Sequence, residues 1–520
     1  MTAPTEVCPF RKGFDFTDPD LIEHGMPIAE FAQLRRTEPV WWNEQLPGTG
    51  GGFHDGGYWV ISKHAHVREI SKNSQVWSTN ANGAIIRLPE YVTSDQIEFT
   101  KALLINHDPP EHTRLRKIVS RIFTPKAVGA LHERLKESAA RIVTDAAAKA
   151  DGNFVDDVAI HLPLQAILDL IGVPEPDRAR IHLLVDAIIN SDDPDQSIDP
   201  ATANAELLGY AYNMAEERRK NPTDDIVTTL VQADIDGEAL NELEFGFFVI
   251  LLITAGNETT RNATTHGMNA FFDHPDQWEL FKRERPATTV DEILRWATPV
   301  HAFQRTALSD TTVGGVEIAE GQRVGLFYSS ANYDEDVFDD PFTFNISRDP
   351  NPHLAFGGNG AHFCIGANLA RLELRLIFDA IADTLPDISR IGDMRRVRSG
   401  WLNGVKELDV LIRETHTQLH TLMLPRVIPR RQLRSSCATS TPGPTTLSRI
   451  SVASETTCRR SVGVLDVDQG DSDDGGAGRR RGDPRRLRAA ARAAAGPDHQ
   501  LPHHGWADRV RPTGVERRSR

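Results

Sequence analysis

The spacing of apolar residues predicts helices along most of this chain. Between residues 125 and 230, apolar positions recur with helical periodicity in one segment after another. Residues 241–274 form the longest such run, and a helix of that length would span about 50 Å. Asn241 suits the N-cap of this helix, because Glu244 follows three residues later and can complete a capping box. A helix of this size is long enough to cross a whole domain.

The middle of the long helical segment contains a polar interruption. Gly256 lies within A-G-N-E-T-T, residues 255–260, and a glycine in a helix interior costs about 1 kcal/mol relative to alanine. Acid and hydroxyl side chains follow it in an otherwise apolar helix. The pattern predicts a local distortion with a polar cluster facing a cavity. The alternative is a kink whose polar side chains are all satisfied.

Runs of aromatic and β-branched residues predict a few short strands. One run starts at Trp41, and a second, residues 58–61, follows a glycine-rich loop, so the two predict a hairpin. Further strand-like runs lie between residues 303 and 326. Residues 401–404 resemble a hairpin tip, and residues 408–412 are predicted to form its return strand.

Charge and cysteine content narrow the classes of function. The chain has 520 residues and a net charge of −15. From residue 416 onward it has 19 arginines, no lysine and 10 acidic residues, a charge of +9, whereas the 39 basic and 63 acidic residues of 1–415 give −24. An acidic body argues against a nucleic-acid partner. Four cysteines without paired spacing and the lack of an apolar leader predict a reducing cytoplasm, and residues 245–255 are too short an apolar run to span a membrane.

The last hundred residues differ in composition from the rest. Beyond Phe378 there is no Phe or Tyr, and beyond Lys406 there is no Lys. Residues 414–520 consist largely of Arg, Ala, Gly, Pro, Ser and Thr, which is too little apolar content to fold. We predict a disordered Arg-rich extension, or a segment translated in the wrong reading frame, and assign it no function.

The stretch with the clearest chemistry is F-G-G-N-G-A-H-F-C-I-G-A-N-L-A-R, residues 356–371. Its glycines allow the backbone to bend tightly and to approach a flat ligand. Cys364 follows them and precedes a predicted helix, where the helix dipole lowers the pKa of a thiol. A thiolate in this position is suited to a metal, and haem iron is one candidate. The alternative is a buried structural cysteine.

Two further pairs of residues share a helix face. His112 and Arg116 are four residues apart and together can hold carboxylates, or they form an ordinary solvated basic face. Glu292 and Arg295 are three apart and can pair, although such pairs are usually on the surface and contribute little.

Taken together, these motifs resemble the cytochrome P450 superfamily over roughly residues 8–413. The cysteine loop, the long helix with A-G-N-E-T-T, the E-x-x-R pair and the H-T-R-L-R helix occur in the order and approximate spacing of that family. The resemblance implies a mainly α fold, with residues 1–413 as a single triangular domain with small β sheets. Length alone suggests several domains, so the resemblance overrides that expectation.

The resemblance also implies which residues bind haem b. Cys364 would be the axial thiolate ligand of the iron, and Phe356 with the loop glycines would pack near its sulfur. The usual pattern places this Phe seven residues before the Cys, whereas Phe356 stands eight before Cys364, which puts its packing role in question. The implied cofactor-binding residues are His112, Arg116, Ala255, Arg305, Phe356, Gly357, His362, Cys364 and Gly366.

Catalytic and structural roles follow from the same resemblance. Glu258 and Thr259 would be an acid–alcohol pair that relays protons during oxygen activation. Glu292 and Arg295 would form a buried structural network with Arg348. A haem-binding protein without turnover is the alternative from another class, and the Glu258–Thr259 pair argues against it because a carrier needs no proton relay.

A narrower similarity concerns the substrate. W-W-N, G-G-G-F-H-D-G-G-Y-W, the cysteine loop with its extra residue and R-S-G-W-L-N-G resemble the actinobacterial steroid side-chain monooxygenases. This implies hydroxylation of the terminal methyl (C26/C27) of cholesterol or cholest-4-en-3-one, and further turnovers would give the acid. A methyl-branched fatty acid ω-hydroxylase is the alternative. The implied substrate-lining residues are Ile85, Ile86, Leu88, Leu252, Ala255, Gly256, Val300, Phe303 and Trp401.

The expected partners are O₂, a sterol or branched lipid, and a ferredoxin with its ferredoxin reductase. Electrons must come from another protein, because no flavin or iron–sulfur motif is present in the sequence. Basic residues at Arg114, Lys117, Arg121 and Arg371 are expected to meet an acidic ferredoxin, or else they only balance an acidic body.

Overall fold

The structure is a computed structural model. It describes residues 10, 13–46, 52–89, 92–120, 123–223, 225–232 and 240–412. The predicted tail, 414–520, and the predicted contact residue Arg121 lie outside the described residues.

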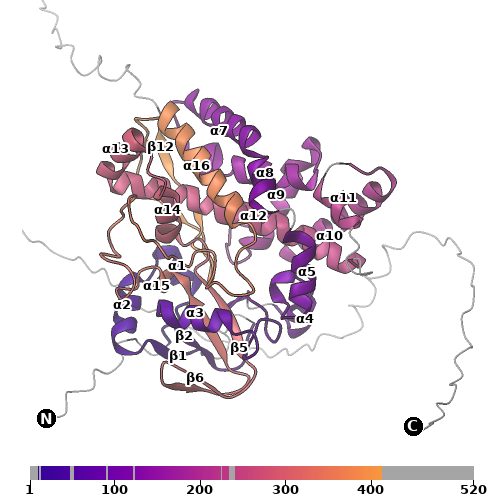
Figure 1. Ribbon diagram of the computed structural model, residues 1–520, viewed down its shortest axis with the longest axis vertical. Coiled ribbons are helices and arrows are strands. Elements are labelled where there is room, and N and C mark those ends of the chain that lie inside the picture. Colours follow the sequence, from indigo (N-terminus) through magenta and orange to yellow (C-terminus); the bar gives the residue numbers. More distant parts are fainter. Residues whose placement is uncertain are drawn as a thin grey trace, which may run out of the picture. The chain divides into compact units, whose positions relative to one another are not determined.

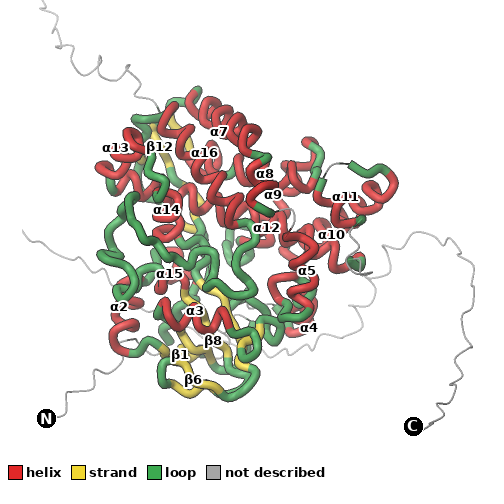
Figure 2. The backbone as a smooth tube through the Cα atoms, viewed as in Figure 1, coloured by secondary structure: helices red, strands yellow, loops and turns green. Residues whose placement is uncertain are grey.

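Helices account for most of the described chain, and most strands gather at one end of it (Figure 1, Figure 2). The α-helices are α1 Pro19–His24, α2 Ile28–Thr37, α3 His64–Lys72, α4 Ser94–Thr100, α5 Glu111–Ser120, α6 Pro125–Gly129, α7 His132–Ala147, α8 His161–Ile171, α9 Glu175–Ile189, α10 Pro200–Lys220, α11 Ile226–Val231, α12 Glu242–Asp273, α13 Pro275–Glu284, α14 Thr289–Ala297, α15 Tyr328–Ala331 and α16 Ala367–Thr384. A 3-10 turn, η1 Leu104–Asn106, and a π-helical turn, η2 Val155–Ala159, complete them. The strands are β1 Val40–Glu44, β2 Gly57–Ile61, β3 Trp77–Ser78, β4 Asp151–Asn153, β5 Ala302–Ala307, β6 Thr311–Val313, β7 Val316–Ile318, β8 Arg323–Phe327, β9 Ser389–Arg390, β10 Arg395–Arg396, β11 Val405–Glu407 and β12 Asp409–Leu411.

The long central helix α12 begins as predicted. The side chain of Asn241 accepts from the N–H of Glu244 at 2.9 Å, and the Glu244 carboxylate accepts from the N–H of Asn241 at 2.9 Å. These two bonds satisfy backbone donors that a helix start leaves free. The predicted distortion at Gly256 is wrong, since α12 is continuous from Glu242 to Asp273. A Cβ at Gly256 would lie 3.2 Å from Ile167, so the glycine lets α8 pack closely against α12.

The main sheet has the strand order β1-β2-β8-β5-β3. The predicted hairpin is present, because β1 pairs antiparallel with β2 from Val40 opposite Ile61 to Glu44 opposite Gly57. The predicted strand-like region 303–326 forms β5 to β8. Strand β8 joins the two halves of the sheet, pairing parallel with β2 and antiparallel with β5.

The C-terminal strands differ in part from the prediction. Residues 401–404 do lie between β10 and β11, which pair antiparallel, so the return strand is β11 rather than the predicted 408–412. Strand β12 instead pairs with β4 and β9. Strand β4 was not predicted because its sequence, Asp-Gly-Asn, is typical of a turn. Only its distant partner β12 holds it extended.

A buried ionic network fixes α14 to the segment that leads to the cysteine loop. Glu292 and Arg295 are fully buried and joined by two hydrogen bonds of 2.8 Å. Arg348 donates to Glu292 at 3.1 Å, and Arg295 also donates to the carbonyls of Asn332 and Pro341 at 2.9 Å. The alternative of an ordinary surface pair is therefore wrong, and the implied network with Arg348 is present.

We predict that Glu292→Ala destabilises the protein strongly. Removing the carboxylate leaves two buried guanidinium groups without their acid, which typically costs about 3–5 kcal/mol. Urea unfolding measures this free energy. Glu279→Ala is the matched control, because Glu279 forms the same i,i+3 pair with Lys282 at 2.7 Å on the surface and should cost under about 1 kcal/mol. Equal losses in the two variants would contradict the network's role.

Candidate haem-thiolate site

The cysteine loop packs against α3 and is also fixed by a hydrogen bond within the loop. The N–H of Cys364 donates to the carbonyl of Phe356 at 2.9 Å. A Cβ at Gly360 would lie 1.6 Å from the carbonyl oxygen of Ser71, and one at Gly358 would lie 2.2 Å from the Ser71 hydroxyl. These two glycines are therefore needed for close packing against α3. Gly357 differs, since its φ of +95° requires glycine for the bend.

Protein groups alone do not hold Cys364 as a thiolate. Cys364 is exposed over part of its surface, yet the protein atoms packed around its sulfur raise the pKa of the thiol above its ordinary value. The N–H groups of Gly366 and Ala367 and the charge of Arg116 lower that pKa by a smaller amount. The predicted net lowering at a helix N-terminus is thus wrong, because burial outweighs the helix dipole. A bound metal cation would favour the thiolate form.

The four predicted propionate donors converge near the cysteine loop. The ring centroids of His112 and His362 are 4.2 Å apart, and Arg116 donates to the carbonyl of Phe363 next to the cysteine. Burial lowers the pKa of His112 to about 4, with the Arg116 charge adding to the effect. Burial lowers the pKa of His362 to about 2, with the Arg305 charge as the next contribution. Both imidazoles are therefore neutral at pH 7, beside two guanidinium groups.

Acidic partners for these guanidinium groups are scarce. Arg305 is 5% exposed and donates a hydrogen bond to the carbonyl of Gln304 at 2.6 Å. Within the part of the chain that the structure describes, neither Arg305 nor Arg116 has an ion pair. The nearby Asp108 already accepts hydrogen bonds from the Ser78 hydroxyl and from the N–H of Thr79.

Guanidinium groups that lie within the protein and lack acidic partners favour a ligand that carries carboxylates. His107, which sequence reasoning missed, adds a buried Nε2 atom with no partner in the same region. The residues present thus fit haem, whose two propionates are such carboxylates. Among the described residues no cluster of three or more His, Cys, Asp or Glu side chains is arranged to hold a metal ion.

The predicted acid–alcohol pair lies in α12, but its two members point to different partners. The Thr259 hydroxyl donates to the carbonyl of Ala255 at 3.0 Å. Glu258 is 2% exposed, forms an ion pair with Arg261 and accepts from Asn262 at 3.1 Å. Burial raises the pKa of Glu258, and the Arg261 charge opposes that shift.

The Glu258 network extends towards the surface. Arg261 also lies 3.7 Å from Asp186 of α9, whose side chain is 28% exposed. Sequence reasoning missed Arg261, although its i,i+3 spacing from Glu258 was visible.

Ala255 is exposed while Asn257 and Glu258 next to it are buried, so α12 faces open space on the side of Ala255.

The predicted substrate-lining residues divide into two groups. Phe303 and Trp401 are half-buried and stack with centroids 6.1 Å apart, and Val300 lies beside them because it forms a β-bridge with Leu402. Ile86 is instead fully buried among core residues, so it faces the core rather than a channel.

The other predicted lining residues lie beside Ile86 or in α12. Ile85 and Leu88 flank Ile86 and are half-buried. Leu252 is 7% exposed in the helical core. Gly256 is turned towards Ile167 of α8, as described above.

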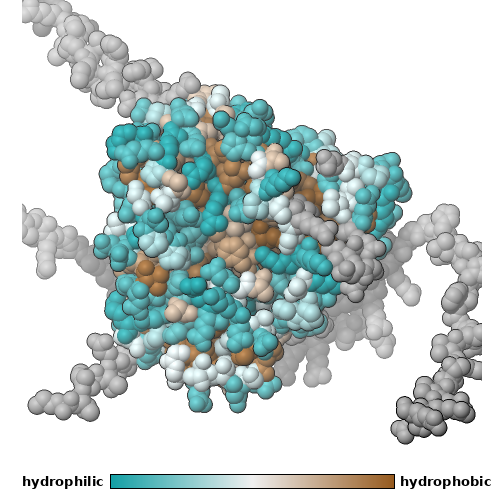
Figure 3. All heavy atoms as spheres, in the orientation of Figure 1, coloured by the Kyte–Doolittle hydropathy of each residue, from teal (hydrophilic) through white to brown (hydrophobic). Residues whose placement is uncertain are grey.

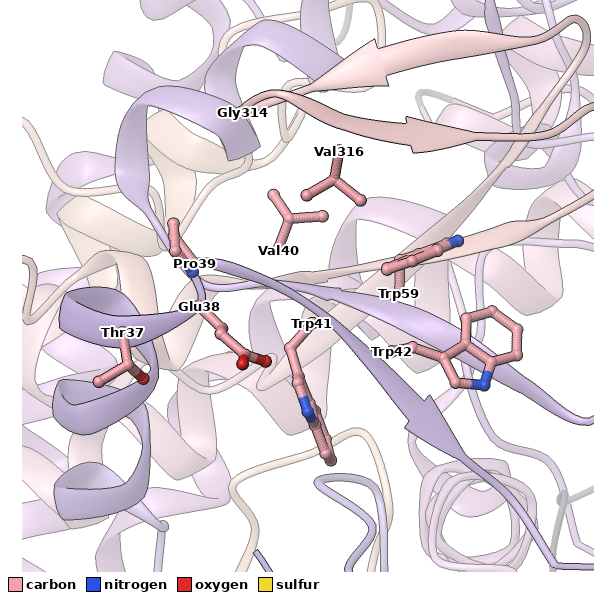
Figure 4. A pocket seen from close by; sticks show the side chains of 9 residues that line it. All are labelled: Thr37, Glu38, Pro39, Val40, Trp41, Trp42, Trp59, Gly314 and Val316. Carbon is pink, nitrogen blue, oxygen red and sulfur yellow. The ribbon is translucent and has the colours of Figure 1, made fainter. Parts of the chain in front are cut away.

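One cleft at the surface, of about 550 Å³, contains none of the predicted site residues (Figure 4). It is lined by Thr37, Glu38, Pro39, Val40, Trp41, Trp42, Trp59, Gly314 and Val316. Another, of about 250 Å³, lies beside the cysteine loop and is lined by Arg68, Asp291, Asn351, Pro352, His353, Phe356, Asn359, Phe363 and Arg371. The chemistry predicted above therefore lies away from the larger cleft.

The surface shown in Figure 3 is mostly hydrophilic, with hydrophobic patches between the hydrophilic residues. Among the described helices, none alone combines the length and apolarity of a membrane span. Two segments, Val155–Ile171 and Glu175–Ile189, meet those criteria only together and are bent by 116° at the break between them.

Comparison with known proteins identifies the family. The family model described as Cytochrome P450 matches residues 287–382. A steroid C26-monooxygenase of Rhodococcus jostii is 60% identical over 399 residues, which cover 77% of this chain and 84% of the relative. A steroid C26-monooxygenase of Mycobacterium tuberculosis is 57% identical over 410 residues, with 79% and 94% covered.

A more distant relative and a solved structure agree. A methyl-branched lipid omega-hydroxylase of M. tuberculosis is 40% identical over 392 residues, with 73% of this chain and 90% of the relative covered. The solved structure of a Mycobacterium marinum cytochrome P450 in complex with pseudoionone has a TM-score of 0.71 and 34% identity, and covers 78% of this chain and 99% of that one. The loop around Cys364, its buried cations and these relatives lead to one conclusion: the chain belongs to the cytochrome P450 family of haem-dependent monooxygenases.

Proposed function

We propose that this protein hydroxylates the terminal methyl (C26/C27) of the side chain of cholesterol or cholest-4-en-3-one in sterol catabolism, and that further turnovers give the acid. The observation that carries the proposal is the identity of 60% and 57% with steroid C26-monooxygenases over more than three quarters of the chain. Identity with the methyl-branched lipid omega-hydroxylase is only 40%. Hydroxylation of methyl-branched lipids is therefore the second candidate.

The haem site is proposed to be built as follows. Cys364 ligates the iron, and His112, Arg116, Arg305 and His362 hold the propionates. The proposal is supported by the convergence of these groups and by their lack of acidic partners, as described above. The bound haem supplies the activation of O₂, one atom of which enters the substrate while the other leaves as water.

Glu258 and Thr259 are proposed to deliver protons. The support lies in the surroundings of Glu258, which is buried, carries a raised pKa and is linked through Arg261 to the partly exposed Asp186. Arg261 does not itself give up a proton, so Glu258 would take a proton from solvent near Asp186 and pass it inward to a group hydrogen-bonded to the Thr259 hydroxyl. In this arrangement Glu258 must leave Arg261 for part of each turnover.

The substrate is proposed to lie along the half-buried aromatic pair Phe303 and Trp401 with Val300. A sterol is a rigid apolar body, so its burial against such side chains is driven by the hydrophobic effect. Ile85 and Leu88 are proposed to line the same channel. Ile86 acts by packing underneath them, because its side chain is fully buried.

The protein is proposed to work in the cytoplasm as one P450 domain over residues 1–413. Its electrons are proposed to come from a ferredoxin and its ferredoxin reductase. Basic side chains near the cysteine loop support an acidic electron donor. Arg114 pairs with Glu111 and Glu244. Lys117 lies on the surface, and Arg371 is 37% exposed while it pairs with Asp291.

We predict that Cys364→Ala abolishes the thiolate signature. The reduced protein with bound CO should show the red-shifted Soret band of a thiolate-ligated haem, because an anionic sulfur donates charge to the iron. Absorption spectroscopy of the purified protein measures the band. Cys8→Ala is the control and should keep it, whereas retention of the band in Cys364→Ala would refute the ligand assignment.

We predict that Glu258→Gln and Thr259→Ala uncouple electron use from hydroxylation. A positioned proton donor contributes about 10²-fold or more, so product formation should fall by that order while reducing equivalents are diverted to hydrogen peroxide. The ratio of product to O₂ consumed measures this coupling. Thr265→Val is the matched control, because the Thr265 hydroxyl donates to the carbonyl of Arg261 at 2.9 Å in the same helix. Unchanged coupling in both site variants would exclude the relay.

We predict that cholest-4-en-3-one binds at least about tenfold more tightly than a methyl-branched fatty acid, a difference of about 1.4 kcal/mol. Titration of the low-to-high-spin shift gives both dissociation constants. Trp401→Ala should weaken sterol binding by about tenfold or more through lost apolar contact. Trp42→Ala, in the remote cleft, should leave it unchanged. Tighter binding of the fatty acid would favour the second candidate function.

A further inference from the structure

A second cluster of polar side chains lies beside the cysteine loop, separate from the proposed haem-binding and proton-delivery residues. Asp291, in the first turn of α14, accepts two hydrogen bonds on the same oxygen, Oδ1. One comes from Nε of Arg371 in α16 at 2.8 Å, and the other from Nε2 of His353 at 3.1 Å. The two helices pack against each other, so a single carboxylate links α14, α16 and the segment before the cysteine loop.

The histidine of this cluster is held in one tautomer. Nδ1 of His353 accepts from the N–H of Ala355 at 3.2 Å, so the proton is on Nε2, which donates to Asp291. The His353 side chain is only 3% exposed, so it is fixed by its surroundings. The ring also lies 5.8 Å from the ring of Phe356.

The other arm of the cluster reaches the backbone of Cys364 through Phe356. The guanidinium carbon of Arg371 lies 4.6 Å from the centroid of the Phe356 ring, within the range of a cation–π contact. The carbonyl of Phe356 in turn accepts from the N–H of Cys364 at 2.9 Å. A continuous path of contacts therefore runs from Asp291 through Arg371 and Phe356 to Cys364.

The position of Phe356 in the loop explains why this path of contacts matters. Phe356 stands eight residues before Cys364, in a loop one residue longer than the usual family pattern, and a longer loop has more conformations to lose. Arg371 is 37% exposed. Without Asp291, its long side chain is free to turn away into solvent.

We propose that Asp291 is a positioning residue for the thiolate ligand: it pins Arg371 over Phe356, which fixes the lengthened cysteine loop and keeps a positive charge beside Cys364. The inference rests on the proposed ligand role of Cys364.

The direction in which the reduction potential changes distinguishes a positioning role of Asp291 from a direct effect of its charge. A positive charge near the sulfur raises the potential of the bound haem iron, and a negative charge lowers it. If Asp291 acted only through its own charge, Asp291→Ala would raise the potential. If it pins Arg371, Asp291→Ala lowers the potential in the same direction as Arg371→Gln, because the guanidinium is released.

The experiment measures the reduction potential of the haem-loaded protein by spectroelectrochemistry, together with the fraction of the CO complex that keeps the thiolate band. Asp291→Ala and Arg371→Gln should both lower the potential and the thiolate fraction. Asp291→Asn should not lower the potential, since the amide oxygen still accepts from Arg371 while the negative charge is gone. Asp379→Ala is the matched control, because this similarly exposed acid of α16 pairs with Arg285 at 3.0 Å, and it should match the wild type.

Several results would overturn the proposal. A potential that rises equally in Asp291→Ala and Asp291→Asn would mean that only charge matters, and shifts no larger than those of Asp379→Ala would mean that the cluster does not influence the sulfur. Should Asp291→Ala fail to fold, Arg371→Gln decides the matter, because an unchanged potential in that variant excludes the path. A wild-type protein without the thiolate band would overturn the ligand role itself, a failure distinct from these.

Discussion

Burial of ionisable groups around Cys364 is the constraint on which the site depends. The protein atoms around the sulfur raise the pKa of this thiol, and a bound metal cation would favour the thiolate form. The same region buries the guanidinium of Arg305 beside Arg116 and two neutral histidines, so it also needs carboxylates. The proposed haem site would satisfy both needs at once, because haem carries a metal cation at its centre and two propionates at its edge. In that proposal the fold and the cofactor are complementary in charge.

The rest of the fold supports this arrangement mechanically. The fully buried Glu292–Arg295 pair anchors α14 to the segment around residues 332–351, and that segment leads directly into the cysteine loop. Asp291, the neighbour of Glu292, extends the same anchoring to α16. On the other side, α12 packs closely on α8 because Gly256 has no side chain. The ligand loop and the proposed proton relay are therefore both held by rigid elements.

Much of this was predictable from local sequence, and the failures have physical causes. The capping box of α12 and the first hairpin depend on neighbouring residues, so the sequence pattern sufficed. Strand β4 and the pairing of β12 depend on contacts between residues more than 250 positions apart, which local patterns do not reveal. The pKa of Cys364 was mispredicted because the helix dipole is a local effect, whereas burial arises only when the chain is folded. The sequence motif predicts Glu258 as a site residue. Its ion pair with Arg261 was not predicted, although the i,i+3 spacing of the two residues allows it.

The central claim, oxidation of a sterol side chain, is tested most directly by product analysis. Purified protein, supplied with ferredoxin, its reductase and NAD(P)H, is incubated with cholest-4-en-3-one under ¹⁸O₂, and the products are examined by mass spectrometry. The account predicts one ¹⁸O atom in a hydroxyl group at C26 or C27. Label elsewhere on the sterol, or no sterol oxidation while a methyl-branched lipid is hydroxylated at its terminal methyl, would contradict it.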